Sequence, residues 1–348
     1  MKAVDRVDYI DIAKGIAISI VILGHVLVDE NYTRYIYAFH LPVFFFISGV
    51  FCKPERYQSL VSFARIKAKT LLIPYVSLYL LSLIYWVTVE SRTPFVIDFT
   101  PIKGFLYATD NGWMYPNGAL WFLPALFVTE VLFYLTYKIN QGKYPLLPIL
   151  IGFAAVGSLL SYFGAFRLPF GINSSFMAVF FLGIGYLLKK QALNIDNRPN
   201  LISLLIALLL FLIMGCFAVL NQKPDMDYVK YGNPLLFILA AFSGIVATLY
   251  FSKGISPNRF LKFLGKNSLL IMGLQFPIIR GVLHIYASFT NQSEHYIRNS
   301  ILDALMCTVL AIAVVVPFIF LFNRYFYVLL GKQKGKSISL ASVENKEA

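Results

Sequence analysis

The sequence predicts an all-α fold, a polytopic integral membrane helical bundle of about ten transmembrane helices with both termini in the cytoplasm. Hydrophobic residues make up 58% of the 348 residues, and charged residues make up only 14%. Soluble domains carry about 25% charged residues, so a soluble core could not hide this much apolar surface. Two further observations support the prediction. Apolar runs recur along the chain, and positive charge alternates from loop to loop.

The apolar runs give the expected spans, each close to the ~20 residues that cross a bilayer. The second run is short and glycines interrupt the fifth, so the expected number of spans is about ten. The expected spans are residues 10–28, 37–52, 70–89, 119–137, 146–163, 172–188, 200–220, 234–252, 267–287 and 301–327.

The charge of the loops predicts the orientation. One set of alternate loops is rich in Lys and Arg, whereas the other set has fewer cations and several acidic residues. The positive-inside rule places the basic loops and both termini in the cytoplasm of a protein of the inner (cytoplasmic) membrane. The net charge of +13 is therefore assigned to loops beside anionic lipid, and no nucleic-acid partner is expected.

The chain is expected to form one transmembrane domain over residues 1–331, followed by a basic and polar cytoplasmic tail at 332–348 that is disordered. The first span is expected to stay in the mature protein, because Asp5, Asp8 and Asp11 lie where a cleavable signal would be basic. The largest outer loop, 90–118, is rich in Gly, Pro and aromatic residues and is expected to fold over the bundle as a lid or acceptor platform.

The first span carries an ionisable residue near each end, Lys14 and His25. They are 11 residues apart, close to three turns, so both project from one face, roughly 16 Å apart along the axis. Polar groups at membrane depth are costly unless they serve a cavity or a partner. His25 is either a general base or proton relay, or a histidine wetted by the interface at a helix end.

A second histidine, His40, opens the second span. The short link between the first two spans makes them an antiparallel hairpin, so His25 and His40 are expected at similar depth. The two histidines form a catalytic pair, or one of them only holds the other by a hydrogen bond. Pro42 either interrupts this span or lies in its first turn, where proline is tolerated.

A basic run lies in the loop before the third span. It is either ordinary cytoplasmic charge or a site for the phosphates of an anionic cofactor, which Lys14 would join. The run consists of Arg65, Lys67 and Lys69.

The fourth span contains Trp121, an interfacial anchor or a platform for sugar stacking, and Glu130, an intramembrane carboxylate that needs a partner or water. Arg280 is a candidate partner for Glu130, unless it extends to the membrane surface. His284 and His295 are expected at the surface. The three cysteines are widely spaced and form no metal-binding pattern with histidine, so no metal site is predicted.

These segments resemble the membrane acyltransferase-3 family. Lys14 and His25 resemble its R/K-x10-H signature. The resemblance implies about ten helices, acetyl-CoA as the acyl donor, and a sugar hydroxyl of a cell-surface polysaccharide or lipid-linked glycan as the acceptor. In order, DIAKGIAISIVILGH, FHLPVFFFISG, RIKAKTLLIPY, ALWFLPALF and LGKNSLLIM resemble landmarks of its sugar O-acetyltransferase (fucose 4-O-acetylase-like) branch.

Residue by residue, the resemblance implies that His25 is the essential histidine and that His40 is the second-helix histidine of this branch. Gln275 lies near a position where many relatives have a histidine, and its amide can hydrogen-bond a substrate. The residues expected to bind the donor are Lys14, Arg65, Lys67 and Lys69, and those expected to bind the acceptor substrate are Trp121, Glu130 and Gln275.

Two other functions are compatible with the sequence. A transporter or flippase of a glycan or lipid-linked intermediate would also have about ten spans and intramembrane charges. The protein could instead be a scaffold subunit of a glycan-export machine. Within the first reading the donor could be succinyl-CoA, and direct attack and an acetyl-histidine relay are not distinguished.

Overall fold

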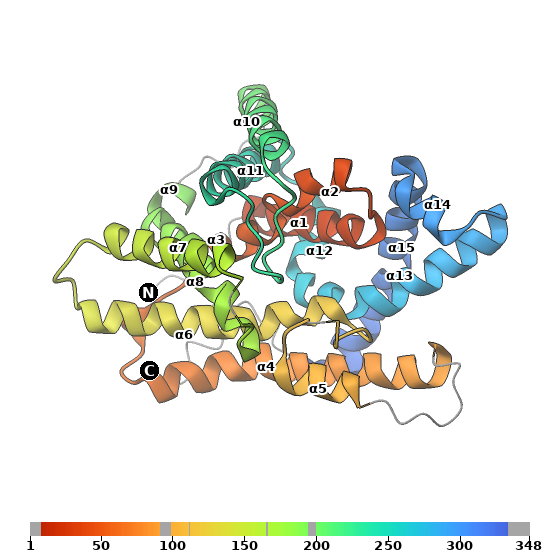
Figure 1. The fold of residues 1–348 in the computed structure, drawn as a ribbon, viewed down its shortest axis with the longest axis horizontal. Helices are drawn as coiled ribbons and strands as arrows, with labels where there is room; N and C mark the ends of the chain where they lie inside the picture. The colour runs from red at the N-terminus through yellow and green to blue at the C-terminus, as the bar shows by residue number, and fades with distance from the viewer. Residues whose placement is uncertain (1–7, 91–98, 111, 165, 194–199, 333–348) are drawn as a thin grey trace.

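The computed structural model describes residues 8–90, 99–110, 112–164, 166–193 and 200–332 (Figure 1). Over these ranges the regular structure is helical, apart from an isolated bridge between Asp225 and Lys230. The predicted all-helical fold is confirmed for this part of the chain. The helices are α1 (Asp8–Val26), α2 (Glu30–Tyr37), α3 (His40–Phe51), α4 (Leu60–Tyr85), α5 (Thr100–Tyr107), α6 (Phe122–Asn140), α7 (Leu146–Tyr162), α8 (Ile172–Leu187), α9 (Lys189–Leu193), α10 (Leu201–Leu220), α11 (Pro234–Gly254), α12 (Arg259–Lys266), α13 (Ser268–Thr290), α14 (Glu294–Asn299) and α15 (Ile301–Tyr325).

Nine helical segments within the described ranges are long and apolar enough to cross a membrane. They match nine of the ten expected spans. The remaining one, expected at 146–163, is α7, which has 17 residues. At 1.5 Å per residue its length is about 25 Å, short of the ~30 Å hydrocarbon core. The fold is that of a multi-pass membrane protein, and the side on which each terminus lies stays a prediction.

Helix α10 has the apolar surface expected for contact with lipid. Only 22% of its most apolar window is buried inside the protein. A soluble protein rarely leaves so large an apolar surface uncovered. The exposed side chains of α10 include Leu205, Leu208, Leu209 and Leu212.

Helix α1 runs through the middle of the bundle and contacts α3, α11, α12, α13 and α15 (Figure 1). Its buried residues extend from Tyr9 to Val26, which explains why the segment is apolar nearly all round rather than along one stripe. A polar side chain on α1 therefore meets protein or a cavity rather than hydrocarbon.

Two pairs of glycines allow helices to approach backbone to backbone. A Cβ at Gly15 of α1 would collide with the carbonyl of Leu261 in α12, and one at Gly265 of α12 would collide with the carbonyl of Asp11. The close contact between α3 and α8 has the same form, with Gly49 facing the carbonyl of Leu182 and Gly185 facing that of Phe46. Small residues at such crossings are typical of packed membrane helices.

The second candidate span in the structure, Glu30–Phe51, consists of two helices, and the expected span 37–52 corresponds to the second of them. Helix α2 begins after Asp29, whose side chain accepts a hydrogen bond from the backbone N–H of Asn31, and ends before Ala38. Helix α3 begins at His40, as predicted, and Pro42 lies in its first turn. A proline is tolerated there because the first N–H groups of a helix have no intrahelical acceptor.

The expectation that the basic run lies in a loop is wrong. Helix α4 begins at Leu60, where the Ser59 side chain caps it by accepting a hydrogen bond from the N–H of Ser62. A polar first turn does not register as an apolar run, so the sequence pattern placed the start of the helix about ten residues too late. Arg65, Lys67 and Lys69 are therefore residues of α4.

The described part of the outer loop packs on the bundle. The hydroxyls of Tyr75 and Tyr79 donate to the carbonyls of Phe105 (2.6 Å) and Pro101 (2.7 Å). The side-chain amide of Asn117 donates to the carbonyl of Gly273 on α13 (2.7 Å). Residues 91–98 of the expected lid, and 333–348 of the expected tail, lie outside the described residues.

Candidate active site

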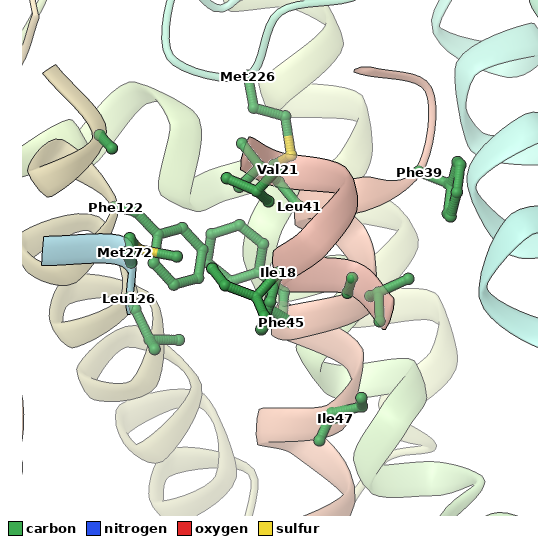
Figure 2. Packing of buried hydrophobic residues seen from close by; sticks show 14 of the residues in the cluster. Ile18, Val21, Phe39, Leu41, Phe45, Ile47, Phe122, Leu126, Met226 and Met272 are labelled. Atoms are coloured by element: carbon green, nitrogen blue, oxygen red, sulfur yellow. The ribbon is translucent and has the colours of Figure 1, made fainter. Parts of the chain in front are cut away.

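Two cavities of about 210 and 160 Å³ meet inside the bundle. The larger, the lysine pocket, is lined by Lys14, Lys266 and Lys332 together with mostly apolar side chains. The smaller, the histidine pocket, is lined by His25 and His40. Phe122 and Met272 line both cavities and so form the wall between them. Figure 2 shows these two side chains beside Leu126, Ile18 and Phe45.

Helix α1 contributes to both cavities. Asp11 and Lys14, near its start, line the lysine pocket, and Val21 and His25, near its end, line the histidine pocket. The 11-residue spacing predicted this common face, and the structure adds that each end serves a different cavity.

His25 lies in the last turn of α1, and Arg298 holds that end of the helix. The guanidinium donates from Nε to the carbonyl of Val26 (3.0 Å) and from Nη2 to the carbonyl of His25 (3.1 Å). A cation at a helix C-terminus satisfies carbonyls that have no intrahelical donor. The ring of His25 packs edge-on against Phe276, with 4.9 Å between centroids.

The hydrogen bond of His40 defines its tautomer. Nδ1 lies 2.8 Å from the carbonyl oxygen of Ile36. A carbonyl only accepts, so Nδ1 donates, and Nε2 is the nitrogen with a lone pair in the neutral ring. Tyr37 packs edge-on against the ring of His40 at 4.9 Å. Both histidines thus line one cavity.

Three carboxylates also line the histidine pocket: Asp110, Asp225 and Asp227. The sequence did not predict them as site residues. Asp225 and Asp227 belong to the segment between α10 and α11, whose Met226 lies against Val21 and Leu41 of the core (Figure 2). The only sequence signal was the acidity of the outer loops.

Arg167 joins the segments that carry these carboxylates. Its guanidinium donates to the backbone carbonyls of Asp110 (2.7 Å) and Asp227 (3.2 Å). Burial raises the pKa of Asp227 well above its usual value of 3.8, and the charges of Asp225 and Asp110 raise it further, whereas Arg167 lowers it. Holding Asp227 ionised in this position is therefore unfavourable for folding.

We expect Asp227→Asn to stabilise the protein at neutral pH. When the pKa of a carboxyl is higher in the folded than in the unfolded state, the free energy of unfolding falls as pH rises from the unfolded-state pKa to the folded-state pKa. The uncharged amide of asparagine does not titrate, so the variant has no such loss. The variant should melt about 2 °C higher or more at pH 8, the size of shift that about 1 kcal/mol gives. Thermal unfolding in detergent between pH 4 and 8 measures the difference. A difference that is the same at both ends of this range would contradict the account.

The lysine pocket brings together cations from three parts of the chain. Lys14 forms an ion pair with Asp11 (3.0 Å). Lys332 donates to the side chain of Asn323 (2.6 Å), and burial lowers its pKa. Lys266 and Lys332 were not among the predicted donor-binding residues, although Lys266 lies within the LGKNS motif.

The other predicted donor-binding residues lie on α4 outside the lining of this pocket. Arg65 and Lys69 are exposed, whereas Lys67 is buried and forms an ion pair with Glu130 of α6 at 3.2 Å. The expectation that Arg280 pairs with Glu130 is wrong. Because α13 packs beside the end of α4, Arg280 instead pairs with Glu90 at 2.5 Å.

The three predicted substrate-binding residues are not brought together. Trp121 lines the histidine pocket and is buried, while Glu130 lines the lysine pocket. Gln275 is 1% exposed and lines neither cavity, and its amide atoms have no hydrogen-bond partner among the described residues. His284 and His295 are exposed, as expected. In the part of the chain that the structure describes, no group of three or more His, Cys, Asp or Glu side chains could hold a metal ion.

The helices and cavities define a multi-pass membrane protein with two chemically different pockets that meet at one wall. A comparison with protein families matches residues 7–323 to the acyltransferase-3 family, described as an acyltransferase domain. The chain belongs to this family and is a membrane acyltransferase, which confirms the family resemblance. No curated protein and no solved structure matches the chain.

Proposed function

We propose that this protein is a membrane O-acyltransferase of the inner (cytoplasmic) membrane. It moves an acetyl group from cytoplasmic acetyl-CoA to a hydroxyl of a sugar in a cell-surface polysaccharide or lipid-linked glycan. The observation that carries the proposal is the pair of cavities, one with lysines and one with histidines, that share the Phe122 and Met272 wall. Such an arrangement lets a donor and an acceptor approach one point from opposite sides.

The lysine pocket is the proposed donor site. Phosphate groups bind ammonium groups through charge-assisted hydrogen bonds, which suits Lys14, Lys266 and Lys332. The apolar side chains of the lining suit the pantetheine arm and the acyl group. Two carboxylates that also line the pocket, Asp11 and Glu130, form ion pairs with Lys14 and Lys67. Arg65 and Lys69, exposed on α4, are placed to attract the anionic donor, whereas the ion pair of Lys67 with Glu130 gives Lys67 a role in joining α4 to α6.

The histidine pocket is the proposed site of transfer. His25 takes the proton of the acceptor hydroxyl, the hydroxyl oxygen forms an ester bond with the thioester carbonyl carbon, and the carbon–sulfur bond breaks. The proton then passes from His25 to the departing CoA thiolate. In the relay form of the reaction a ring nitrogen of His25 first bonds to the carbonyl carbon as the carbon–sulfur bond breaks, and CoA leaves as the thiol with the proton of the ring. The acetyl group then passes from His25 to the hydroxyl, whose proton goes to Nε2 of His40. His40 holds or relays the proton, and Trp121 supports the sugar ring.

The test uses purified protein in liposomes, with labelled acetyl-CoA on one side and a crude host glycan on the other. We expect label in the glycan together with stoichiometric release of CoA, and only when the donor faces the lysine pocket. Movement of glycan across the membrane without CoA release would overturn the proposal in favour of a transporter. Transfer from a succinyl donor in preference to acetyl would overturn the choice of donor alone.

We expect neutralisation of the pocket lysines to weaken donor binding. Lys14→Gln and Lys332→Gln should each raise the KM for acetyl-CoA about tenfold with little change in kcat, because each removes a charge-assisted bond of about 1.4 kcal/mol or more that the donor makes in both ground and transition states. Lys143→Gln, at an exposed turn between α6 and α7, is the matched control. An unchanged KM in the Lys14 and Lys332 variants would remove the donor from this pocket.

A further inference from the structure

We propose that the histidine pocket binds the acceptor as a single sugar ring without negative charge, held through its hydroxyls by Asp110, Asp225 and Asp227. This inference rests on the proposed function and specifies its acceptor. Neutral and amino sugars fit this description, and uronic or other acidic sugars do not.

The charge of the side chains that line the cavity favours a ring without negative charge. Among the described residues that line this cavity, the charged side chains besides the two histidines are the three carboxylates. The cations that lie nearby are outside the lining, and Arg298 among them is bonded to the backbone carbonyls of His25 and Val26. The guanidinium of Arg167 is bonded to backbone carbonyls and packs on the ring of Tyr228 at 4.1 Å, and the ammonium of Lys223 lies over Tyr37 at 4.4 Å. The described lining residues therefore offer an acidic ring no Lys or Arg as a partner, and the crowding of carboxyl groups that raises the pKa of Asp227 also disfavours a further negative charge there.

One carboxyl oxygen at the cavity lacks a hydrogen-bond partner, which favours a ligand with hydroxyl donors. The Asp227 side chain is only 7% exposed, and its Oδ1 has no hydrogen-bond partner among the described residues. A buried polar atom left without a partner is unfavourable, and such atoms in folded proteins call for an explanation. Asp227 lines the cavity, so a rotation of its carboxyl group toward the bound ring lets a sugar hydroxyl donate to Oδ1 and supply the missing bond.

The neighbouring carboxylates are held in position by backbone groups. Oδ1 of Asp225 accepts from the N–H of Asp227 (3.0 Å), and Oδ1 of Asp110 accepts from the N–H groups of Gly112 (3.0 Å) and Met114 (3.3 Å). Fixed carboxylates of this kind act as preorganised acceptors for hydroxyl donors. Gly118 also lines the cavity, and a Cβ there would come within 2.9 Å of Asp110 Oδ2.

The size and the aromatic lining of the cavity suit a single sugar ring. Trp121, Tyr37 and Tyr228 line it, and ligand sites combine such rings with a few placed polar groups. Its volume is about 160 Å³, and a cavity of ~150 Å³ holds one benzene ring. The pocket therefore admits at most one ring of the acceptor, and further sugar units would lie outside it.

The test compares methyl glucoside with methyl glucuronide, and methyl galactoside with methyl galacturonide. Each pair differs only in whether C6 is a hydroxymethyl group or a carboxylate. We expect wild-type protein to transfer acetyl to the neutral member at least tenfold faster at equal concentration. In the double variant of Asp225→Asn and Asp227→Asn, the neutral member should lose about tenfold and the ratio within each pair should fall below about threefold. Glu30→Gln, an exposed carboxylate on α2, is the matched control and should leave both unchanged.

Binding gives a readout that does not depend on transfer. Trp121 is the only tryptophan that lines the cavity, so its fluorescence is isolated by replacing Trp86 and Trp113 with Phe. Neutral glycosides should change this fluorescence saturably and uronides should not, until the two Asp residues are replaced. Equal binding of both members by wild-type protein, or no saturable binding of either, overturns the inference. Acetyl transfer to the host glycan with CoA release, measured in parallel, shows whether the proposed function stands in that event.

Discussion

His25→Ala is expected to reduce acetyl transfer by about 10² to 10⁴-fold, the range that a positioned acid–base group contributes. The loss should appear in kcat, because in the proposed reaction His25 acts on the hydroxyl, and it does not line the lysine pocket, the proposed donor site. The fold should survive, because the bonds from Arg298 to the end of α1 reach backbone carbonyls that alanine retains. Initial rates of CoA release and the KM for acetyl-CoA measure the effect.

The matched control is His284→Ala, which removes an exposed histidine from α13 outside both cavities. It should leave the rate within about twofold of wild type. Undiminished turnover in His25→Ala would remove the central residue of the proposed chemistry. An equal loss in both variants would indicate a general effect of altered helices rather than catalysis by His25.

Replacement of Gly15 is expected to have the largest effect on stability. A side chain at this position must occupy the place of the Leu261 carbonyl, so α1 and α12 have to separate. Overpacking in a core costs about 1–3 kcal/mol and more where nothing can yield, and here the obstacle is backbone. Gly15→Val should therefore cost at least about 3 kcal/mol, and most of the protein should fail to reach the folded state in the membrane.

The control for this substitution is a helical glycine with open space around it. A Cβ at Gly281 of α13 would meet no atom within 4 Å. Gly281→Ala should be neutral or stabilising, since alanine has a helix propensity about 1 kcal/mol better than that of glycine. Size-exclusion profiles and thermal unfolding in detergent compare the two variants. Equal stability of Gly15→Val and wild type would mean that α1 and α12 do not cross as closely as described.

Local patterns in the sequence predicted the parts of the structure that depend on a single helix. The apolar runs located nine long helices, and the spacing of Lys14 and His25 predicted their common face. Helix starts were placed late wherever the first turns are polar. The Ser59 cap and the basic turns of α4 lie before the apolar run, so hydropathy alone assigned them to a loop.

The missed site residues come from segments that only the tertiary fold brings together. Asp110 and Asp227 are separated by more than a hundred residues, and both belong to outer segments whose acidity has an ordinary explanation as solvated charge. The choice of Lys67 rather than Arg280 as partner of Glu130 depends on how α4 packs against α6. No local pattern contains that information.

The wall shared by the two cavities has a consequence for the permeability of the membrane. With the donor on the cytoplasmic side and the acceptor on the other, the path for acetyl passes where Phe122 and Met272 stand. On that proposal, those two side chains would also keep water and protons from crossing along the same path. In the proposed reaction a two-carbon fragment passes this point while the membrane stays closed to ions, so a bulky ring and a flexible thioether there would serve as a seal as well as a passage.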